Sequence, residues 1–345
     1  RGEKAALAHG AAAALVLPAE RSVSFLRNFR ERSQDRESVG LSKNNEVGGV
    51  PSVVLGPDLA EKFLAPMDLD LKTLHQTIKA HGRLKSKALG GSAHVVLALQ
   101  KTKTVTQNVA GILDGTDPEL KKEYVVFSAH YDHLQTNAKG QIFPGADDDG
   151  SGTTAVLAIA HAMSLNPPRR SVLIMFHAGE ELGLLGSEYN TEVAPVVPLD
   201  KMVVDLNIDM IGRSKPPGDT DKADEHLTDA NTVYLVGSNR ISRELHKLSE
   251  ETNADYQKLN LNYHYNDPEN PERIYYRSDH WNYAKHGIPI IFYFDGVHVD
   301  YHRPTDTVDK IDFTKLSNIT KLVFETGWRI ANLDHRLARD VKGAK

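Results

Sequence analysis

The residues of this sequence that could carry out chemistry are histidines and carboxylates, and they gather in short clusters near the ends of apolar segments. The clusters are His130-Tyr131-Asp132-His133, Asp147-Asp148-Asp149, His177-Ala178-Gly179-Glu180-Glu181, Asp209 and His298-Val299-Asp300-Tyr301-His302. The chain contains 16 histidines and no cysteine. A transition metal would therefore have to be held by His, Asp and Glu, and the clusters indicate such a metal centre.

The segments between these clusters have the pattern of an α/β domain that would bring them together. Apolar runs of strand length occur at His94–Gln100, Val105–Leu113, Tyr124–Ala129, Ser171–His177, Val203–Ile208, Thr232–Val236 and Pro289–Phe294. Helical patterns occur at Ser151–Leu165, Leu184–Val193, Ile241–Thr252, Asp279–Lys285 and Phe313–Leu333. This alternation predicts a mainly parallel, mixed central sheet with helices on both faces. In such sheets the site lies at the carboxyl ends of the strands, where the clusters fall.

Two long polar segments, Arg213–Asn231 and Asn260–Arg277, are predicted to be loops. Loops of this length inside a compact domain usually shape a site or are disordered. Arg213, Arg273 and Arg277 flank them and could bind a substrate carboxylate, although a solvated surface arginine is the more common interpretation of each.

His130 and Asp132 lie two residues apart after a predicted strand, so strand alternation places them on one side and His133 on the other. A ligating imidazole usually donates its second N–H to a carboxylate, and this pair suits that arrangement. Two polar residues at a strand end near water would give the same pattern, and both interpretations stay open.

The carboxylate clusters also allow two interpretations. Among Asp147–Asp149, one residue is expected to cap the following helix, and a neighbour could bridge two cations. Hydrolysis at a metal needs one carboxylate as ligand and one to take a proton from water, and Glu180 and Glu181 could divide these roles. Glu180 and Glu181 could equally be an acidic pair in the first turn of a helix, where the helix dipole favours negative charge.

Three further positions are weaker candidates when taken alone. Asp209 ends an apolar run, where a helix cap is more common than a metal ligand. His298 and His302 have the helical zinc spacing, but a proline two residues later disfavours a helix, so only one of them is expected to be a ligand. Ser278 and Asp279 are expected to cap the helix that follows them.

Composition excludes several classes of protein. Hydrophobic residues make up 40% and charged residues 25% of the 345-residue chain, which is ordinary for a globular protein. A net charge of −5 provides no field for nucleic acid or anionic lipid, and no apolar run approaches the ~18 residues of a membrane span. The sequence lacks a G-x-S-x-G elbow, a P-loop lysine and an H-E-x-x-H motif.

The first part of the chain has a different character. Helical patterns at Glu3–Gly10 and Leu59–Leu64 and strand-like runs at Ala11–Leu17 and Val50–Leu55 offer little core for a complete domain. We therefore expect a small, partial α+β segment over 1–91 and the α/β domain over 92–345. Because the chain begins at Arg1 without a leader, it is expected to be a processed or trimmed product.

The ordered set AHYDH, PGADDDGSG, GEELGLLGS, NIDMIG, SDHW and DYHRPTDT resembles metallopeptidase family 28, over roughly residues 92–335. That family contains aminopeptidases and glutamate carboxypeptidase-like enzymes, and it binds two zinc ions. The segment 1–91 looks like the later half of a protease-associated domain. The resemblance implies a zinc-peptidase type of fold, a peptide substrate, and export to the periplasm or the outside of the cell.

Carried over by motif, the resemblance implies roles for eight residues of this chain. The metal ligands would be His130, Asp148, Glu181, Asp209 and His302, and the catalytic residues Glu180, Asp132 and Tyr301. His130 and Asp209 would hold one zinc, Glu181 and His302 the other, and Asp148 would bridge them. Glu180 would be the general base, Asp132 would orient His130, and Tyr301 would hydrogen-bond the tetrahedral intermediate. A cis peptide is expected after Asp148, and the remaining histidines match no ligand position.

The implied reaction is peptide-bond hydrolysis, most readily by an aminopeptidase, because acidic residues would meet a free α-amine. A carboxypeptidase or dipeptidase on the same two zinc ions is the closest alternative. A single-zinc enzyme that cyclises N-terminal glutamine, and a binding protein without catalysis, are the others. All five ligands and the base are present, which favours an enzyme.

Overall fold

The computed structural model describes residues 8–18, 40–41, 52–82, 88, 94, 102–137, 139–267 and 269–341. The chain forms two compact units, 1–103 and 104–345, and each has a hydrophobic core of its own. Much of the predicted helix Glu3–Gly10 and nearly all of the predicted strand His94–Gln100 lie outside the described residues, as does the start of the predicted strand Val50–Leu55. None of the helices in the described ranges is both long and apolar enough to cross a membrane.

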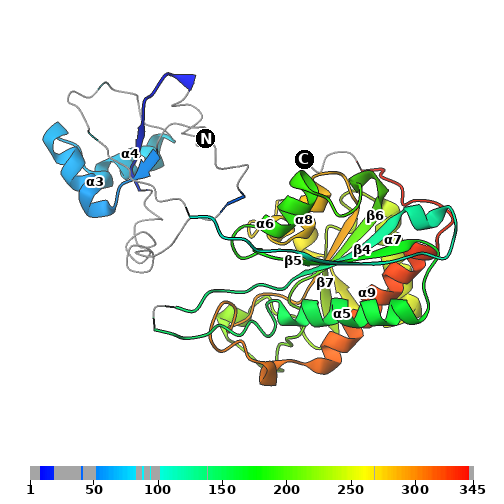
Figure 1. Ribbon diagram of the computed structural model, residues 1–345. Coiled ribbons are helices and arrows are strands. Elements are labelled where there is room, and N and C mark those ends of the chain that lie inside the picture. The colour runs from blue at the N-terminus through cyan, green and yellow to red at the C-terminus, as the bar shows by residue number, and fades with distance from the viewer. Residues whose placement is uncertain are drawn as a thin grey trace. The chain divides into compact units, whose positions relative to one another are not determined.

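In the described residues of the first unit there are two short parallel strands and two α-helices (Figure 1). Strand β1 (Ala14–Val16) pairs with β2 (Ser52–Val54), and α3 (Pro57–Leu64) and α4 (Leu71–His81) follow. Leu55, Ala60 and Leu64 are at the centre of its small core. Helix α4 was not predicted from the sequence, although the residues at its two ends are typical helix boundaries. Asp70 accepts a hydrogen bond from Thr73 N at 2.8 Å, and Gly82 ends the helix in a left-handed conformation.

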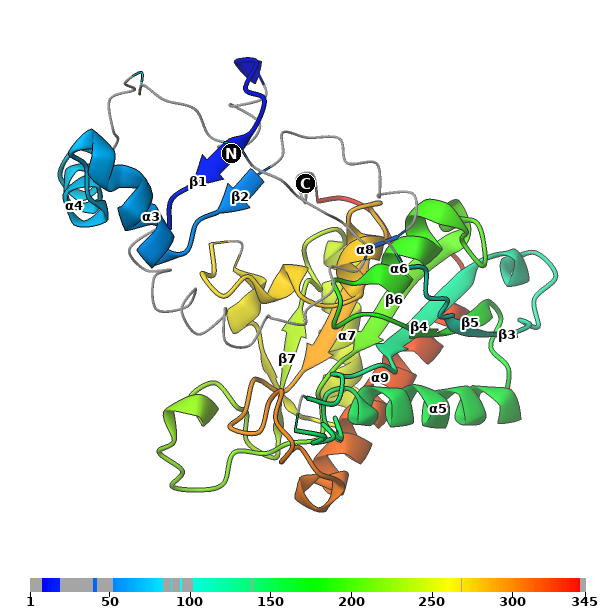
Figure 2. The same ribbon diagram turned by 60° about the vertical axis from the view of Figure 1, so that its left-hand side comes forward.

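The second unit is built on a seven-stranded sheet of order β3-β5-β4-β6-β9-β7-β8. The strands are β3 (Val109–Leu113), β4 (Tyr124–His130), β5 (Ser171–His177), β6 (Met202–Ile208), β7 (Thr232–Val236), β8 (Asn260–Asn262) and β9 (Ile290–Phe294). Pairing is parallel except for β3 with β5 and β7 with β9. The predicted mixed, mainly parallel sheet is confirmed. In Figure 2 the orange strand β9 lies between β7 and β6.

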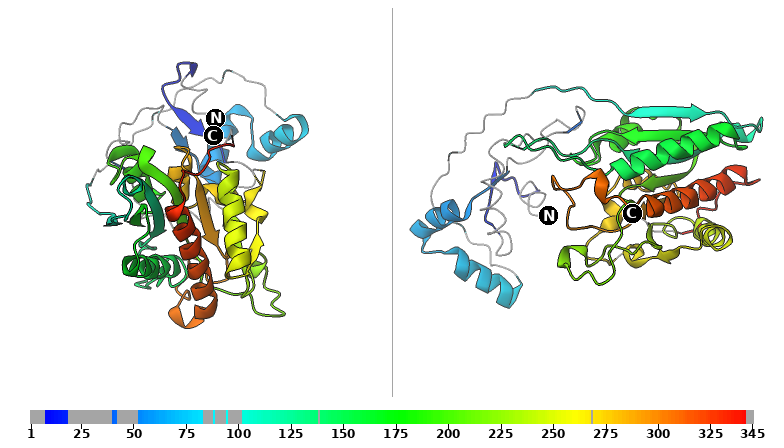
Figure 3. Two further views of the ribbon diagram at one scale, coloured as in Figure 1. Left: turned by 90° about the vertical axis from the view of Figure 1, so that its right-hand side faces the viewer. Right: turned by 90° about the horizontal axis from the view of Figure 1, so that it is seen from below.

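Helices cover both faces of this sheet, as predicted (Figures 1 and 2). Helices α5 (Gly150–Leu165), α7 (Arg243–Asp255) and α9 (Phe313–Asn332) pack on one face. The left view of Figure 3 shows α9 between α5 and α7. The shorter α6 (Leu185–Glu188) and α8 (His280–Ala284) lie on the other face. A five-residue π-helix, Tyr189–Val193, continues α6.

The central strands are mostly apolar because both of their faces are buried. In β4, Val125 and Phe127 belong to the core beneath α5 and α9, whereas Val126 belongs to the core on the opposite face. The long polar segments are not wholly irregular. They contain short 3-10 turns, and β8 adds an edge strand to the sheet within the segment predicted to be a loop.

Candidate metal centre and active site

Three strands of the sheet end beside one another and carry the site's side chains at their carboxyl ends. His130 is the last residue of β4, Asp209 follows β6 directly, and Glu180 and Glu181 stand shortly after the end of β5. Because β4 pairs with both β5 and β6, these side chains start from one edge of the sheet. The structure thus brings together residues that are far apart in the sequence.

Two adjacent carboxylates in the turn before α5 have different partners. Asp149 is the N-cap of α5 and accepts hydrogen bonds from Gly152 N at 2.9 Å and Met210 N at 3.2 Å. Asp148 instead faces the histidines of the site, and the Asp148–Asp149 peptide is cis, as expected. The cap interpretation therefore holds for Asp149, and Asp148 is left free for another role.

Asp148 lies at the centre of the five predicted metal ligands. Its Oδ1 is 3.2 Å from His130 Nε2, and its Oδ2 is 3.2 Å from His302 Nε2. Asp209 Oδ1 lies 3.6 Å from His130 Nε2, and Glu181 Oε2 lies 3.1 Å from His302 Nε2. One carboxylate thus stands between a His–Asp pair and a His–Glu pair.

Several polar atoms of this group are buried without a hydrogen-bond partner among the described residues. They include His130 Nε2, Asp148 Oδ2 and Glu181 Oε1. Orphaned buried donors and acceptors are costly, and atoms of this kind facing one another fit bound cations. Imidazole and carboxylate donors with no thiolate suit zinc and related divalent metals. The residues present therefore fit the group that the sequence implies.

The electrostatics of the group reflect this crowding of charge. Burial raises the pKa of Asp148, but the imidazoles of His130 and His302 beside it outweigh burial and hold the pKa below its usual value. Burial lowers the pKa of His302, but Asp148 and Glu181 raise it to about 9. Without a metal, the imidazoles would act as the counter-ions of the carboxylates.

Asp132 is placed to organise both His130 and the Glu180–Glu181 pair. His130 Nδ1 lies 3.0 Å from the backbone carbonyl of Asp132 and 3.7 Å from its carboxylate. The carboxylate accepts hydrogen bonds from Glu180 N at 3.1 Å and Glu181 N at 3.4 Å. A donating Nδ1–H leaves Nε2 of His130 free to bind a metal.

Glu180 and Tyr301 face the same pocket as the carboxylates. Burial, with the charges of Asp209 and Asp279, raises the pKa of the Glu180 carboxyl well above its usual value despite the opposing charge of His130. Tyr301 stacks on His302, with ring centroids 3.8 Å apart. Burial and the charge of Asp148 raise the pKa of Tyr301, so its hydroxyl keeps its proton.

His133 joins this group, although the sequence analysis matched it to no ligand position. Its Nδ1 lies 2.8 Å from Glu181 Oε1 and 3.9 Å from Asp148 Oδ2. The chain bends back at Gly145, where φ is +60°, and any Cβ there would come within 2.6 Å of the His133 ring. The sequence signal for this contact is the glycine, which alone allows the approach.

A second hydrogen-bonded layer holds Asp209 and corrects one expectation. Ser278 Oγ donates to Asp209 Oδ2 at 2.6 Å and accepts from Asn207 Nδ2 at 3.0 Å. Helix α8 begins with no side-chain cap, so the expected capping by Ser278 or Asp279 is wrong. Ser278 instead donates its hydrogen bond to the buried carboxylate of Asp209, which would be costly to leave without a donor.

Three other histidines contact residues outside the five predicted ligands. His298 Nε2 lies 3.2 Å from the Asp147 carboxylate, and His177 Nε2 lies 3.0 Å from the Tyr283 hydroxyl. His280 Nε2 contacts the backbone carbonyl of Tyr275 at 2.8 Å. None of these three rings faces Asp148, so His302 is the ligand candidate of the His298–His302 pair.

The three loop arginines have different surroundings. Arg213 is neither a solvated arginine nor a substrate ligand, because its guanidinium pairs with Asp300 at 2.7 Å and Asp306 at 3.5 Å and is largely buried. Arg273 stacks over the Tyr276 ring. Arg277 reaches the site, where its Nη2 lies 3.4 Å from the Tyr301 hydroxyl.

A pocket opens beside the cluster of acidic residues and has an apolar wall. It is lined by Asp148, Glu180, Asp209, Met210, Ile274, Arg277, Phe292, Phe294, Val297, Tyr301 and His302. One side therefore offers carboxylates and the other offers aliphatic and aromatic surface. Arg277 is the only lysine or arginine among these lining residues.

Comparison with known proteins gives the family. Residues 108–327 match the sequence pattern of Peptidase family M28. This chain belongs to Peptidase family M28. The match spans most of the second unit and contains all eight residues that the sequence resemblance implied.

Curated relatives of this M28 chain include aminopeptidases. Aminopeptidase YwaD of Bacillus subtilis is 29% identical over 210 residues, which are 59% of this chain and 43% of that protein. A probable leucine aminopeptidase of Arthroderma benhamiae is 29% identical over 230 residues, which are 62% of this chain and 56% of that protein. The chain thus spans about half the length of these relatives.

Solved structures show the same fold. A zinc aminopeptidase from Bacillus subtilis superposes with a TM-score of 0.52 at 23% identity, over 66% of this chain and 50% of that one. An aminopeptidase from Aneurinibacillus sp. strain AM-1 gives a TM-score of 0.51 at 20% identity, over 68% of this chain and 50% of that one.

Proposed function

We propose that this M28 chain is a zinc-dependent aminopeptidase that releases N-terminal residues from peptides. The observation that carries the proposal is the arrangement of two imidazoles and two carboxylates around Asp148, with buried polar atoms that have no other partner. The pocket beside them combines acidic groups with an apolar wall. The aminopeptidases among the relatives support the same assignment.

We infer two zinc ions. His130 and Asp209 would hold one, Glu181 and His302 the other, and Asp148 would bridge them. His133 lies close enough to Glu181 to join the second set. Zinc at such a site lowers the pKa of bound water and polarises a carbonyl group.

The protein's own groups would handle protons and orientation. Glu180 would accept the proton of the attacking water and pass it to the leaving amine, a role that suits its raised pKa. Asp132 fixes the backbone of Glu180 and the ring of His130. The protonated Tyr301 hydroxyl would donate a hydrogen bond to the oxyanion that develops on the scissile carbonyl.

The charge distribution in the pocket favours a free amine over a free carboxylate. Asp148, Glu180 and Asp209 would attract the α-ammonium group of a substrate, and Ile274 and Phe294 would contact an apolar first side chain. The carboxypeptidase or dipeptidase alternative rests on Arg277, which could pair with a terminal carboxylate.

The test is metal content together with turnover of a small panel of substrates. Leu-, Ala- and Lys-p-nitroanilide would be compared with an N-blocked dipeptide that has a free carboxylate. About two zinc ions per chain and cleavage of the free-amine substrates, with Leu fastest, are expected. Cleavage of only the blocked dipeptide would move the assignment to a carboxypeptidase. Absence of turnover after zinc reconstitution would leave a binding protein.

Export remains a prediction from the family resemblance. Fractionation of cells that express the full-length gene product, with zymography of each fraction on a leucyl substrate, would test it. Activity confined to the cytosolic fraction would overturn this prediction.

A further inference from the structure

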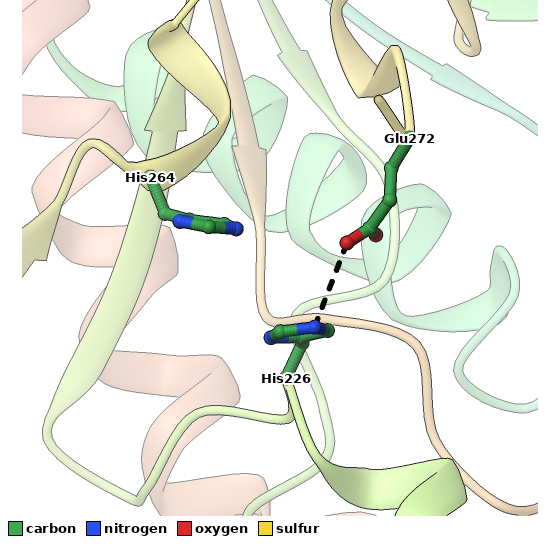
Figure 4. Close-up of side chains that lie close together, drawn as sticks. All are labelled: His226, His264 and Glu272. Carbon is green, nitrogen blue, oxygen red and sulfur yellow. Dashed lines mark ion pairs between the residues drawn. The ribbon is translucent and has the colours of Figure 1, made fainter. Parts of the chain in front are cut away.

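A second group of metal-binding side chains lies outside the site described above, where the two long polar segments meet. His226 comes from the segment between β6 and β7, and His264 and Glu272 come from the segment that follows β8. Figure 4 shows the three side chains converging from these two parts of the chain. They share no residue with the group around Asp148.

The geometry of this group is close to that of a three-ligand metal site. One nitrogen of each histidine and one oxygen of Glu272 all lie within 4.8 Å of one another. His226 Nε2 is 3.5 Å from Glu272 Oε1, and the two imidazole rings are stacked with centroids 5.5 Å apart. Ligands at about 2.0–2.1 Å in a tetrahedral site stand about 3.3 Å apart, so small side-chain rotations would complete it.

Two buried tyrosines donate hydrogen bonds to His226 and Glu272 of this group. The Tyr265 hydroxyl donates to Glu272 Oε2 at 3.2 Å, and the Tyr234 hydroxyl donates to the backbone carbonyl of His226 at 2.8 Å. Metal-binding carboxylates in proteins are held by such outer hydrogen bonds.

The exposure of the group leaves room for an ion to enter. The His226 side chain is 42% exposed and that of Glu272 is 35% exposed. Two imidazoles and one carboxylate match the ligand preference of Zn²⁺, whereas Ca²⁺ and Mg²⁺ prefer all-oxygen sites. Three protein ligands would leave one coordination position for water.

We propose that His226, His264 and Glu272 bind one further divalent transition-metal ion, Zn²⁺ in preference, which cross-links the two long loops. The consequence for the loops is specific. Ile274 and Arg277, which line the pocket, follow Glu272 closely in the same segment. An ion at this position would fix the segment that carries part of the pocket wall, and the proposal does not depend on the reaction performed there.

The test compares zinc binding by the full chain and by variants. The His226→Ala/His264→Ala double variant is expected to bind one zinc ion fewer per chain than the wild type at micromolar free zinc. His286→Ala is the matched control, because His286 is also a partly exposed histidine and its Nε2 lies 3.0 Å from Glu192, but among the described residues it belongs to no group of three possible metal ligands. The control should bind as many zinc ions as the wild type.

Anomalous diffraction at the zinc edge gives an independent measurement of position. A peak between His226, His264 and Glu272 in zinc-soaked wild-type crystals, absent in the Glu272→Ala variant, is expected. Zinc should also slow amide hydrogen exchange in both loops of the wild type and not in the double variant. Equal zinc content in the wild type and the double variant, or a zinc-loaded crystal with no peak at this position, would overturn the proposal.

Discussion

Glu180 is the residue on which catalysis should depend most, because it faces the pocket and has no role in holding the five predicted ligands. Glu180→Gln keeps the shape of the side chain but removes its ability to accept a proton. We expect kcat to fall by about 10²–10⁴-fold with an unchanged zinc content. Steady-state kinetics on a leucyl substrate, with metal analysis of the same sample, measure both quantities.

The surface residue Glu192 provides the control for that variant. It pairs with Lys285 at 2.8 Å, away from the pocket, and Glu192→Gln should leave kcat unchanged. Wild-type kcat in Glu180→Gln would show that another group takes the proton.

Ser278 is expected to affect metal binding without touching the metal. Its hydroxyl donates to Asp209 Oδ2, so Ser278→Ala leaves that carboxylate less well oriented. We expect zinc to bind about tenfold to hundredfold more weakly, as measured by competition with a chelator. Ser214→Ala is the control, because Ser214 Oγ donates to Asp312 Oδ2 at 2.7 Å in a Ser–Asp pair that does not line the pocket. Equal losses in the two variants would contradict a specific role for Ser278.

At the scale of elements, the strands that are buried on both faces were the most predictable. The bounds of β5 and β7 are those expected from the sequence, because a continuous apolar run has few alternatives in an α/β fold. Strand β8 was not predicted, since Asn260-Leu261-Asn262 is a short, polar edge strand, and among the described strands it pairs with β7 alone. Its pairing depends on a neighbour that local sequence does not reveal.

The candidate site was predictable to the extent that it follows strand ends and the family motifs. The five predicted ligands lie close together, and Asp149 caps α5 while Asp148 faces the histidines; the bridging of two cations by Asp148 stays a prediction. The positions of His133 and Arg277 were not predictable, because each depends on a loop path that is set by contacts far along the chain. Strand alternation alone placed His133 on the opposite side.

Strand β6 also contains a buried carboxylate that should make stability depend on pH. Burial raises the pKa of Asp205 to about 8, against about 4 in an unfolded chain. Between these values the folded protein keeps a proton that the unfolded chain has lost, so the stabilising contribution declines as pH rises. In Asp205→Asn this decline is absent.

We therefore expect the free energy of unfolding of Asp205→Asn to rise relative to wild type from pH 5 to pH 8, by at most about 1.4 kcal/mol per pH unit. Urea denaturation of both proteins at several pH values measures the difference. A difference that stays constant with pH would show that Asp205 ionises normally in the folded state.

At the scale of the whole molecule, metal removal should destabilise one unit selectively. Carboxylates face one another around Asp148, and an ion that binds only the folded form stabilises it by about 3 kcal/mol at a hundred times its dissociation constant. In calorimetry, a chelator should lower the midpoint of the unfolding transition of residues 104–345. It should leave the midpoint of residues 1–103 unchanged, because that unit has its own core. Added zinc should restore the midpoint, and an unchanged midpoint would contradict metal binding.

The position of β9 in the sheet has a consequence for how the protein is made. Among the seven described strands of the sheet, β9 comes last in the chain and is made after the others, yet it lies between β6 and β7 and pairs with both. A nascent chain that ends before Ile290 therefore has two partial sheets with unpaired edges, which are the surfaces that aggregate or recruit chaperones. We expect ribosome-bound chains arrested at Lys285 to be cleaved readily by protease over 202–262, whereas released full-length chains resist. Until β9 and then His302 leave the ribosome, the nascent chain has neither a continuous sheet nor the full set of predicted metal ligands.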